Sequence, residues 1–179
     1  IPLNYPPVIS VVGSLNISID EDLVTNTWIS PAISVVDQDT NFSDLVWSIE
    51  NNATHGDISI SGSANAPNVD FVPHLDYFGS DTFTLSVKDI NDANSSDSIT
   101  FNLVINPTDD SPIFETNSTF FTAVVGYEWR YDFTFSDSDG LNGLTVSTEN
   151  LPGWLNFFQS STSSGYLIGV PPSSAEGNH

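Results

Sequence analysis

Acidic residues occur in short groups rather than evenly along the chain. Asp37 and Asp39 form an Asp-x-Asp pattern between two predicted strands, and Asp137 and Asp139 do the same further along the chain. Alternate positions on an extended turn can direct two carboxylates toward one point. Calcium takes about six to eight oxygen ligands and tolerates irregular geometry. These groups are therefore candidate ligands for a hard divalent cation, as are Asp20-Glu21-Asp22, Asp89-Ile90-Asn91-Asp92 and Asp109-Asp110.

Each Asp-x-Asp group also fits a turn that needs no metal, because Asp side chains cap turns by accepting hydrogen bonds from the backbone. An EF-hand does not fit. Counting from Asp37, the sixth position is Phe42, where that loop needs Gly, and the twelfth is Ser48 rather than Glu. For an isolated Asp-x-Asp group, the turn and the metal ligand both stay open.

The overall charge excludes several classes of partner. The 179 residues include 23 acidic and 2 basic side chains, for a formal net charge of −21. Lys88 and Arg130 cannot neutralise a run of phosphates, so the sequence predicts no binding to nucleic acid and none to an anionic membrane surface. No apolar run reaches the roughly 18 residues that a membrane span requires, so no membrane insertion is expected either.

The excess of carboxylates also bears on the compartment. Acidic side chains without basic partners repel one another in a compact fold. Divalent cations among the carboxylates, or a salty medium, would relieve this repulsion, and both point outside the cytosol. The chain has no Cys and therefore neither disulfides nor thiolate chemistry. Hydrophobic residues make up 39% of the chain and aromatic residues 12%, too many for a disordered acidic tail.

Alternating apolar and polar residues predict short strands throughout. Phe83, Leu85 and Val87 face one way, and the residues between them face the other. Many short strands separated by Asn, Asp, Ser, Gly and Pro predict an all-β, sandwich-like protein. The predicted strands are 8–12, 15–19, 27–35, 45–50, 56–61, 69–72, 82–88 and 98–105, then 119–124, 127–135, 144–149, 154–158 and 166–170.

Two similar segment entries predict two tandem modules. Asn4-Tyr5-Pro6-Pro7-Val8-Ile9 opens the first, and Asp109-Asp110-Ser111-Pro112-Ile113-Phe114 opens the second. We therefore expect tandem antiparallel β-sandwiches in residues 1–107 and 108–179. A seven-stranded sandwich needs about 100 residues, so the second module is expected to lack its last strands. Either the parent chain continues, or strands of another chain complete the sheet.

Several motifs carry a resemblance to a known family. The first module contains Glu21-Asp22, Asp37-x-Asp39, His55-Gly56-Asp57-Ile58, Phe71-Val72-Pro73, the run from Tyr77 to Leu85, and Asp89. In these residues it resembles the bacterial tandem cadherin-like repeat. The second contains Val125-Gly126-Tyr127-Glu128, the run from Phe135 to Gly140, Leu151-Pro152-Gly153-Trp154-Leu155 and Leu167-Ile168-Gly169-Val170-Pro171. It resembles the dystroglycan-type cadherin-like, or Ig, domain. Together the resemblances cover nearly the whole chain and imply Ig/cadherin-like sandwiches.

This resemblance implies Ca²⁺ as the cofactor, bound between successive modules. It assigns to the inter-module site Glu21, Asp76, Asn106, Asp109, Asp110, Asp137, Asp139 and Asn142. It also implies that Asp37, Asp39 and Asp89 form half of a second site, facing a missing preceding module. The linker departs from the full cadherin pattern at Asn106 and Thr108, so fewer ions are expected than in a full cadherin linker.

Other chemistries have weaker signals. Zinc would need three or four ligands with local spacing, whereas His55, His74 and His179 are scattered. No nucleophile-elbow motif supports a Ser-His-Asp triad. The acidic groups lie at predicted module ends, where they fit ligands better than the acid/base pair of a glycosidase. We therefore expect no enzymatic activity.

The sequence thus predicts a Ca²⁺-stiffened extender or adhesion segment of a large secreted or cell-surface protein. Its expected partners are neighbouring modules of the same parent chain, with glycans or another surface protein as further candidates. Two alternatives stay open: a carbohydrate-binding module attached to a polysaccharide-degrading enzyme, and an assembly unit of a surface filament. The first would need exposed aromatic rings. Trp47, Trp129 and Trp154 fit the core, and Trp28 alone is uncommitted.

Overall fold

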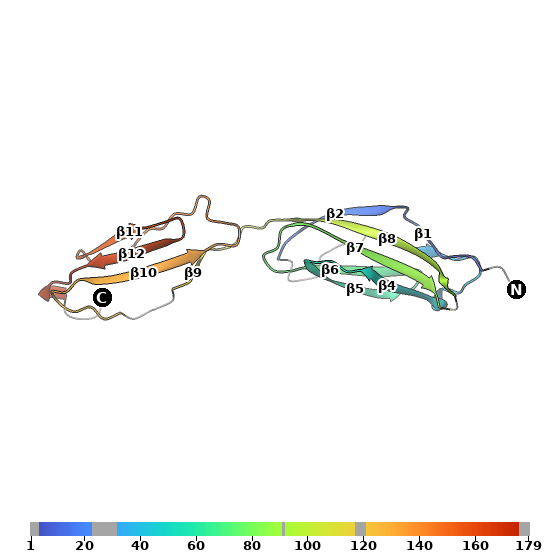
Figure 1. The fold of residues 1–179 in the computed structure, drawn as a ribbon, viewed down its shortest axis with the longest axis horizontal. Coiled ribbons are helices and arrows are strands. Elements are labelled where there is room, and N and C mark those ends of the chain that lie inside the picture. Colours follow the sequence, from blue (N-terminus) through green and yellow to red (C-terminus); the bar gives the residue numbers. More distant parts are fainter. Residues whose placement is uncertain (1–3, 23–31, 91, 117–120, 176–179) are drawn as a thin grey trace. The chain divides into compact units, whose positions relative to one another are not determined.

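The computed structural model describes residues 4–22, 32–90, 92–116 and 121–175 of the chain. The chain divides into two compact units, Ile1–Thr108 and Asp109–His179, each with its own sheets (Figure 1). Strands form nearly all the regular structure of the described residues. Two short 3-10 helices complete it, η1 (Phe42–Asp44) and η2 (Ser173–Ala175). The predicted all-β class is confirmed.

The larger sheet of the first unit has four strands in the order β2 (Ser14–Asp20), β8 (Asp92–Asn106), β7 (Gly79–Asp89) and β4 (Leu45–Asn51). The long hairpin of β7 and β8 occupies its centre, with Phe83 directly opposite Phe101. Apolar residues alternate along both strands as the sequence predicts. Every second residue of β7 is buried, from Asp81 to Asp89.

The other strands of the first unit form two short pairs. β5 (Gly56–Ser63) and β6 (Ala66–Pro73) make an antiparallel hairpin, and β1 (Val8–Ile9) pairs with β3 (Val35–Val36). Residues 27–31 of the strand predicted at 27–35 lie outside the described residues. Val69 and Phe71 of β6 are at most 1% exposed and belong to the same core as Phe83 and Phe101.

The first strands of the chain show where the sequence-based topology was too simple. All pairings were expected to be antiparallel, but β2 runs parallel to β8. The chain first pairs with β3 through β1, then passes Gly13 and joins β8. Gly13 has φ 92°, a left-handed conformation that glycine adopts without steric cost. The first stretch of the chain thus makes an antiparallel pair with β3 through β1 and a parallel pair with β8 through β2.

Three stacked phenylalanines lie at the centre of this core. The ring of Phe83 lies 4.5 Å from that of Phe101 and 6.0 Å from that of Phe71, and both pairs are nearly parallel. Each of the three side chains is at most 1% exposed. Burying a large apolar side chain contributes about 1.5–3 kcal/mol, so this stack ties the β7–β8 hairpin to β6.

The second unit has one four-stranded antiparallel sheet in the order β11 (Leu155–Gln159), β12 (Ser164–Gly169), β10 (Trp129–Ser136) and β9 (Ile113–Phe114). Phe133 and Phe135 are its buried apolar side chains, at 8% and 4% exposure. The strand expected at 144–149 is irregular chain instead. A strand needs a paired neighbour to satisfy its backbone hydrogen bonds, and no described strand pairs with this segment.

The described strands of the second unit make one layer rather than a closed sandwich. In the first unit the sheet that contains the β7–β8 hairpin shares one core with the β5–β6 pair. In the second unit no described strand forms a second sheet of this kind. A cavity of about 220 Å³ lies beside the open face, lined by Pro112, Ile113, Phe114, Phe135 and residues 144–147. Ile113 and Phe114 are 61% and 57% exposed.

The closed core predicts unequal effects for substitutions of phenylalanine in the first unit. Phe83→Ala should lower the free energy of unfolding by about 3–5 kcal/mol, because a fully buried ring leaves a cavity. Phe42→Ala, at a side chain 45% exposed, should cost less than about 1 kcal/mol. Guanidinium unfolding followed by circular dichroism measures both. Equal losses would contradict the core described here.

Candidate functional site

Glu21 is the most deeply buried acidic residue of the chain's described part, at 2% exposure. It follows β2, and its backbone N–H donates to the carbonyl of Asn106 at 2.9 Å. Its Oε1 accepts the N–H of Thr108 at 2.8 Å. Its Oε2 is also buried and has no hydrogen-bond partner among the described residues. Because burying a charged oxygen without a partner is unfavourable, this atom is a candidate ligand for a cation.

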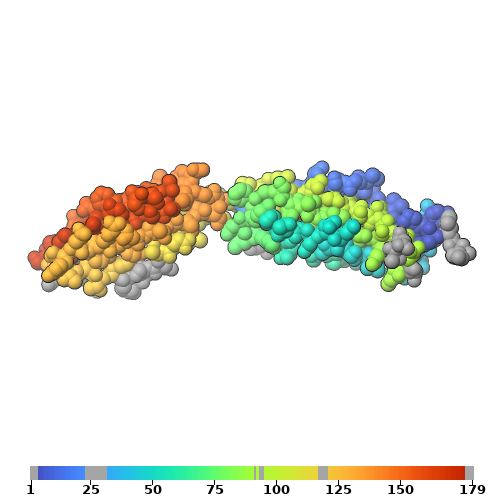
Figure 2. Space-filling view, viewed as in Figure 1, coloured from blue at the N-terminus to red at the C-terminus, as the bar shows by residue number. Residues whose placement is uncertain are grey.

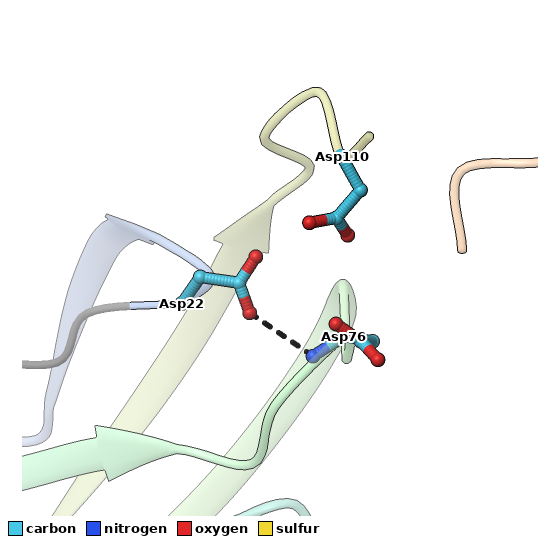
Figure 3. A group of neighbouring side chains, drawn as sticks. All are labelled: Asp22, Asp76 and Asp110. Atoms are coloured by element: carbon cyan, nitrogen blue, oxygen red, sulfur yellow. Dashed lines mark hydrogen bonds between the residues drawn. The ribbon is translucent and has the colours of Figure 1, made fainter. Parts of the chain in front are cut away.

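Asp22 and Asp76 lie together near the same end of the first unit (Figure 3). Oδ1 of Asp22 accepts the backbone N–H of Asp76 at 3.1 Å. Both residues have left-handed backbones, with φ 59° and 57°. Asp76 was among the ligands that the family resemblance implies, whereas Asp22 was a candidate only as part of the acidic run 20–22. The run Asp20-Glu21-Asp22 was the available signal, but the residue of that run nearest Asp76 depends on the turn after β2.

Asn106 also lies at this end, in the last position of β8. Its side-chain Nδ2 donates to Ser18 Oγ and to Asp20 Oδ1, both at 3.0 Å. The amide nitrogen is therefore engaged with β2, and the side-chain oxygen is the group that it can offer to a cation. The last residues of β2 and β8 are thus connected through backbone and side-chain hydrogen bonds.

In the second unit the structure brings Asp110 and Asp139 together. Oδ2 of Asp139 accepts the backbone N–H of Asp110. Oδ1 of Asp137 accepts the N–H of Asp139 at 3.1 Å, and Gly140 closes the turn with φ 97°. This is the capped turn that was the alternative to a metal ligand. Two further expected ligands, Asp109 and Asn142, are both exposed.

The second predicted site lies near the opposite ends of β7 and β8. Oδ1 of Asp37 accepts the N–H groups of Asp39 and Thr40, again as a capped turn. The hydroxyl of Thr40 donates to Asp89 at 2.8 Å, so Thr40 joins Asp37 to Asp89, which is 3% exposed. Asp39 instead accepts the N–H of Tyr5 at 3.0 Å. Oδ2 of Asp37 is buried without a hydrogen-bond partner among the described residues.

Sequence reasoning missed Asp97, which also lies in this region of the first unit. Its Oδ2 accepts the backbone N–H of Ile9 at 2.8 Å, across 88 positions of sequence. The carboxylate therefore fixes β1 against β8. The sequence carried no signal for this role, since Asp97 stands in a polar run that reads as an ordinary exposed stretch.

The bacterial Ig domain family provides a sequence match to residues 4–102. The chain belongs to this family. The match covers the first unit almost completely, including β1 to β7 and most of β8. The finer assignments, to tandem cadherin-like repeats and to a dystroglycan-type domain, stay predictions. No curated protein sequence matches the chain.

Solved structures of cadherin domains share the fold of this chain. The extracellular cadherin domains 1–5 of protocadherin gamma B2 match with TM-score 0.53 and 15% identity, over 93% of this chain and 32% of that one. Domains 1–4 of protocadherin gamma B7 match with TM-score 0.52 and 17% identity, over 93% and 41%. An endo-fucoidan hydrolase of glycoside hydrolase family 107 matches with TM-score 0.43 and 16% identity, over 98% and 27%. The chain thus spans less than half of each of these structures.

His55 and three of the tryptophans make contacts that fit a structural role. His55 stacks on Tyr77, and Nε1 of Trp47 donates to the carbonyl of Ala64. Trp129 and Trp154 make an edge contact at 6.4 Å between ring centroids. Trp28 and His179 lie outside the described residues. No helix in the described part of the chain is long and apolar enough to cross a bilayer.

An exposed row of side chains crosses the outer face of the second unit's sheet. The hairpin of β11 and β12 that carries part of it lies at the surface of this unit (Figure 2). Phe158 stacks on Tyr166 with ring centroids 5.2 Å apart, and the Arg130 guanidinium lies 3.8 Å from the Tyr166 centroid. Arg130 also pairs with Asp132 at 2.6 Å. These rings are engaged with one another, so the row alone does not indicate a sugar site.

The Arg130–Asp132 pair predicts a pH effect that can be measured at one carboxylate. The pKa of Asp132 lies below its ordinary value, chiefly because Arg130 donates hydrogen bonds to it. A carboxyl group whose pKa is lowered on folding stabilises the fold at pH values above its ordinary pKa. This contribution is lost as the pH falls through the pKa of the folded state. Arg130→Gln should raise the pKa of Asp132, as measured by NMR titration of its carboxyl carbon. Lys88→Gln, in the other unit, should leave it unchanged, and an equal shift there would contradict the local origin.

Proposed function

We propose that this chain is a non-enzymatic extender or adhesion segment of a larger secreted or cell-surface protein, and that Ca²⁺ stiffens the joint between its two units. The observation that carries the proposal is the buried Oε2 of Glu21, which has no hydrogen-bond partner among the described residues. It lies one residue from Asp22, whose carboxylate contacts the Asp76 backbone. Hard oxygen donors of this kind suit Ca²⁺.

The first unit would supply the ligands Glu21, Asp22, Asp76 and the side-chain oxygen of Asn106. The second unit would supply Asp110, with Asp109, Asp137, Asp139 and Asn142 as further candidates. Asp22 and Asp76 form an acidic pair at the end of the first unit, and Asp110 of the linker is the third ligand that would complete this group (Figure 3). An ion bound there would supply two positive charges against the surplus of carboxylates.

Covalent connection supports a role for Asp110 whatever the angle between the units. The N–H of Thr108 is held by Glu21, and Asp110 follows two residues later. Consecutive α-carbons are about 3.8 Å apart, so the α-carbon of Asp110 lies within roughly 7.6 Å of that of Thr108. The carboxylate of Asp110 therefore cannot leave the neighbourhood of Glu21. In the absence of cations, these carboxylates would repel one another across the joint.

The opposite end of the first unit would hold a second, weaker half-site. Asp37 and Asp89 are joined through Thr40, and Oδ2 of Asp37 is buried without a hydrogen-bond partner among the described residues. Asp39 would contribute less, because it already accepts the N–H of Tyr5. We propose that a preceding module of the parent chain completes this half-site. The partners of the segment are then neighbouring modules, and glycans or another surface protein stay predictions.

Calcium should raise the melting temperature of the chain, because only the folded state holds the ligands together. At a concentration about 100 times its dissociation constant, one bound ion would stabilise the fold by roughly 2.7 kcal/mol. The measurement compares melts in excess chelator and in millimolar Ca²⁺ at matched ionic strength. Magnesium at the same concentration should do less, since it prefers rigid octahedral sites. An unchanged melting temperature, together with unchanged small-angle scattering, would contradict the proposal.

Charge-removing variants should separate the joint from the half-site. Asp110→Asn and Asp76→Asn should weaken Ca²⁺ binding by at least about tenfold, as loss of even an outer-shell partner commonly does. Asp37→Asn should affect the tighter site much less, because it belongs to the other end of the unit. Asp57→Asn, an exposed carboxylate on β5, is the matched control. Calorimetric titration measures all four, and equal losses would mean that the ions are wrongly placed.

A further inference from the structure

Asp76 lies in a short loop between β6 and β7 that holds it close to another carboxylate. Its backbone is left-handed, with φ 57°, and its N–H donates to Oδ1 of Asp22. The N–H of Tyr77 donates to the carbonyl of His74 at 3.2 Å and closes the loop. The acidic side chains of Asp22 and Asp76 repel each other in this arrangement (Figure 3). The hydrogen bond to Asp22 opposes this repulsion, and further contacts of the loop add to it.

Tyr77, the residue after Asp76, is fixed at both its ring and its hydroxyl group. Its ring stacks on the imidazole of His55, with centroids 3.7 Å apart and planes 7° apart. Its hydroxyl donates to the carbonyl of Ser80 at 3.0 Å. The carbonyl of His55 also accepts the N–H of His74 at 2.9 Å. His55 thus holds the loop through its backbone at one end and through its ring at the other.

Asp81 in turn fixes His55. Its carboxylate, 9% exposed, accepts the backbone N–H groups of Thr54, His55 and Thr82. The bond from His55 is 2.6 Å long. Asp81 and Thr82 belong to β7, whereas the donors Thr54 and His55 lie just before β5. This carboxylate therefore ties the start of β7 to the connection that carries His55. Both carboxylate oxygens of Asp81 accept backbone N–H groups. In Glu21 only Oε1 does so among the described residues.

Gly79 leaves the space that Tyr77 needs. Its φ is 139°, a conformation that other residues rarely adopt, and a Cβ placed on it would lie 3.1 Å from the Tyr77 hydroxyl oxygen. The four residues Tyr77, Gly79, Asp81 and His55 therefore form one connected support. Tyr77 is the direct chain neighbour of Asp76, so this support reaches the acidic end of the unit through that loop.

We propose that His55, Tyr77 and Asp81 are positioning residues for the cation ligand Asp76. The inference rests on the proposed Ca²⁺ site at the joint. The stacked rings hold the loop, the loop holds Asp76 against the repulsion of Asp22, and the ligand is therefore placed before an ion arrives. A prearranged ligand set binds more tightly because less ordering remains to be done on binding.

The test measures Ca²⁺ affinity of the whole chain by calorimetric titration. Tyr77→Ala and His55→Ala should each weaken binding by roughly tenfold, in line with the loss of other outer-shell supports of metal ligands. Tyr77→Phe and His55→Phe keep a planar ring for the stack and should bind nearly as well as the unchanged chain. Tyr127→Ala, at a side chain 72% exposed in the second unit, is the control for loss of a tyrosine.

A second readout separates positioning from general stability. Melts in chelator report the stability that each variant has without Ca²⁺, and the further rise on adding Ca²⁺ reports the site. A merely structural role would lower both melting temperatures equally, whereas a positioning role reduces the rise. In chelator, hydrogen exchange of the Asp76 amide should also be faster in His55→Ala than in the unchanged chain or in His55→Phe.

The outcomes distinguish this inference from the function on which it rests. If the unchanged chain takes up no Ca²⁺, the proposed function fails and this inference fails with it. If the unchanged chain binds Ca²⁺ and Asp76→Asn weakens binding, but Tyr77→Ala and His55→Ala bind normally, the inference alone is overturned. If Tyr77→Ala does not fold, His55→Ala and the two phenylalanine variants decide the question.

Discussion

Mutual repulsion among carboxylates is the constraint on which the rest of this structure depends. The chain has 23 acidic and 2 basic side chains, so ion pairing cannot balance them. Arg130 and Asp132 form the one ion pair found among the described residues. Surface charges further apart than about 10 Å are screened at moderate salt. The repulsion therefore acts most strongly where acidic residues gather, which in the first unit is at the two ends of its strands.

Several carboxylates of this chain accept hydrogen bonds from backbone N–H groups instead of pairing with basic side chains. Asp97 holds Ile9, Glu21 holds Thr108, and Asp81 holds Thr54 and His55. Hydrogen bonds to an ionised acceptor are stronger than neutral ones, so each also fastens one segment to a distant one. Two buried oxygens stand apart from this pattern, Oε2 of Glu21 and Oδ2 of Asp37. They lie near opposite ends of the first unit's sheet.

The two units bury their apolar side chains to different degrees. In the first, the β7–β8 hairpin covers β6, and the stack of Phe71, Phe83 and Phe101 excludes water. In the second, the described strands form one sheet, and several of its large apolar side chains stay exposed, Ile113, Phe114 and Phe121 among them. A single sheet layer leaves its inner face to solvent unless another layer packs on it. Strong stabilisation by packing is therefore expected mainly in the first unit.

Local pattern in the sequence determined the all-β class and the alternation of β7, β8 and β10, because period two places neighbouring side chains on opposite faces whatever lies beyond them. It also identified Glu21, Asp76, Asp110 and Asp139 as residues of interest through a family resemblance. Only the tertiary structure showed that Asp22 meets Asp76, that Asp97 holds Ile9, and that β2 runs parallel to β8. These contacts join segments about 54 to 88 residues apart, and the pairing of distant segments follows from how whole sheets pack, which local spacing does not encode. For the same reason residues 144–149 alternate like a strand yet form none, since a strand exists only where a partner pairs with it.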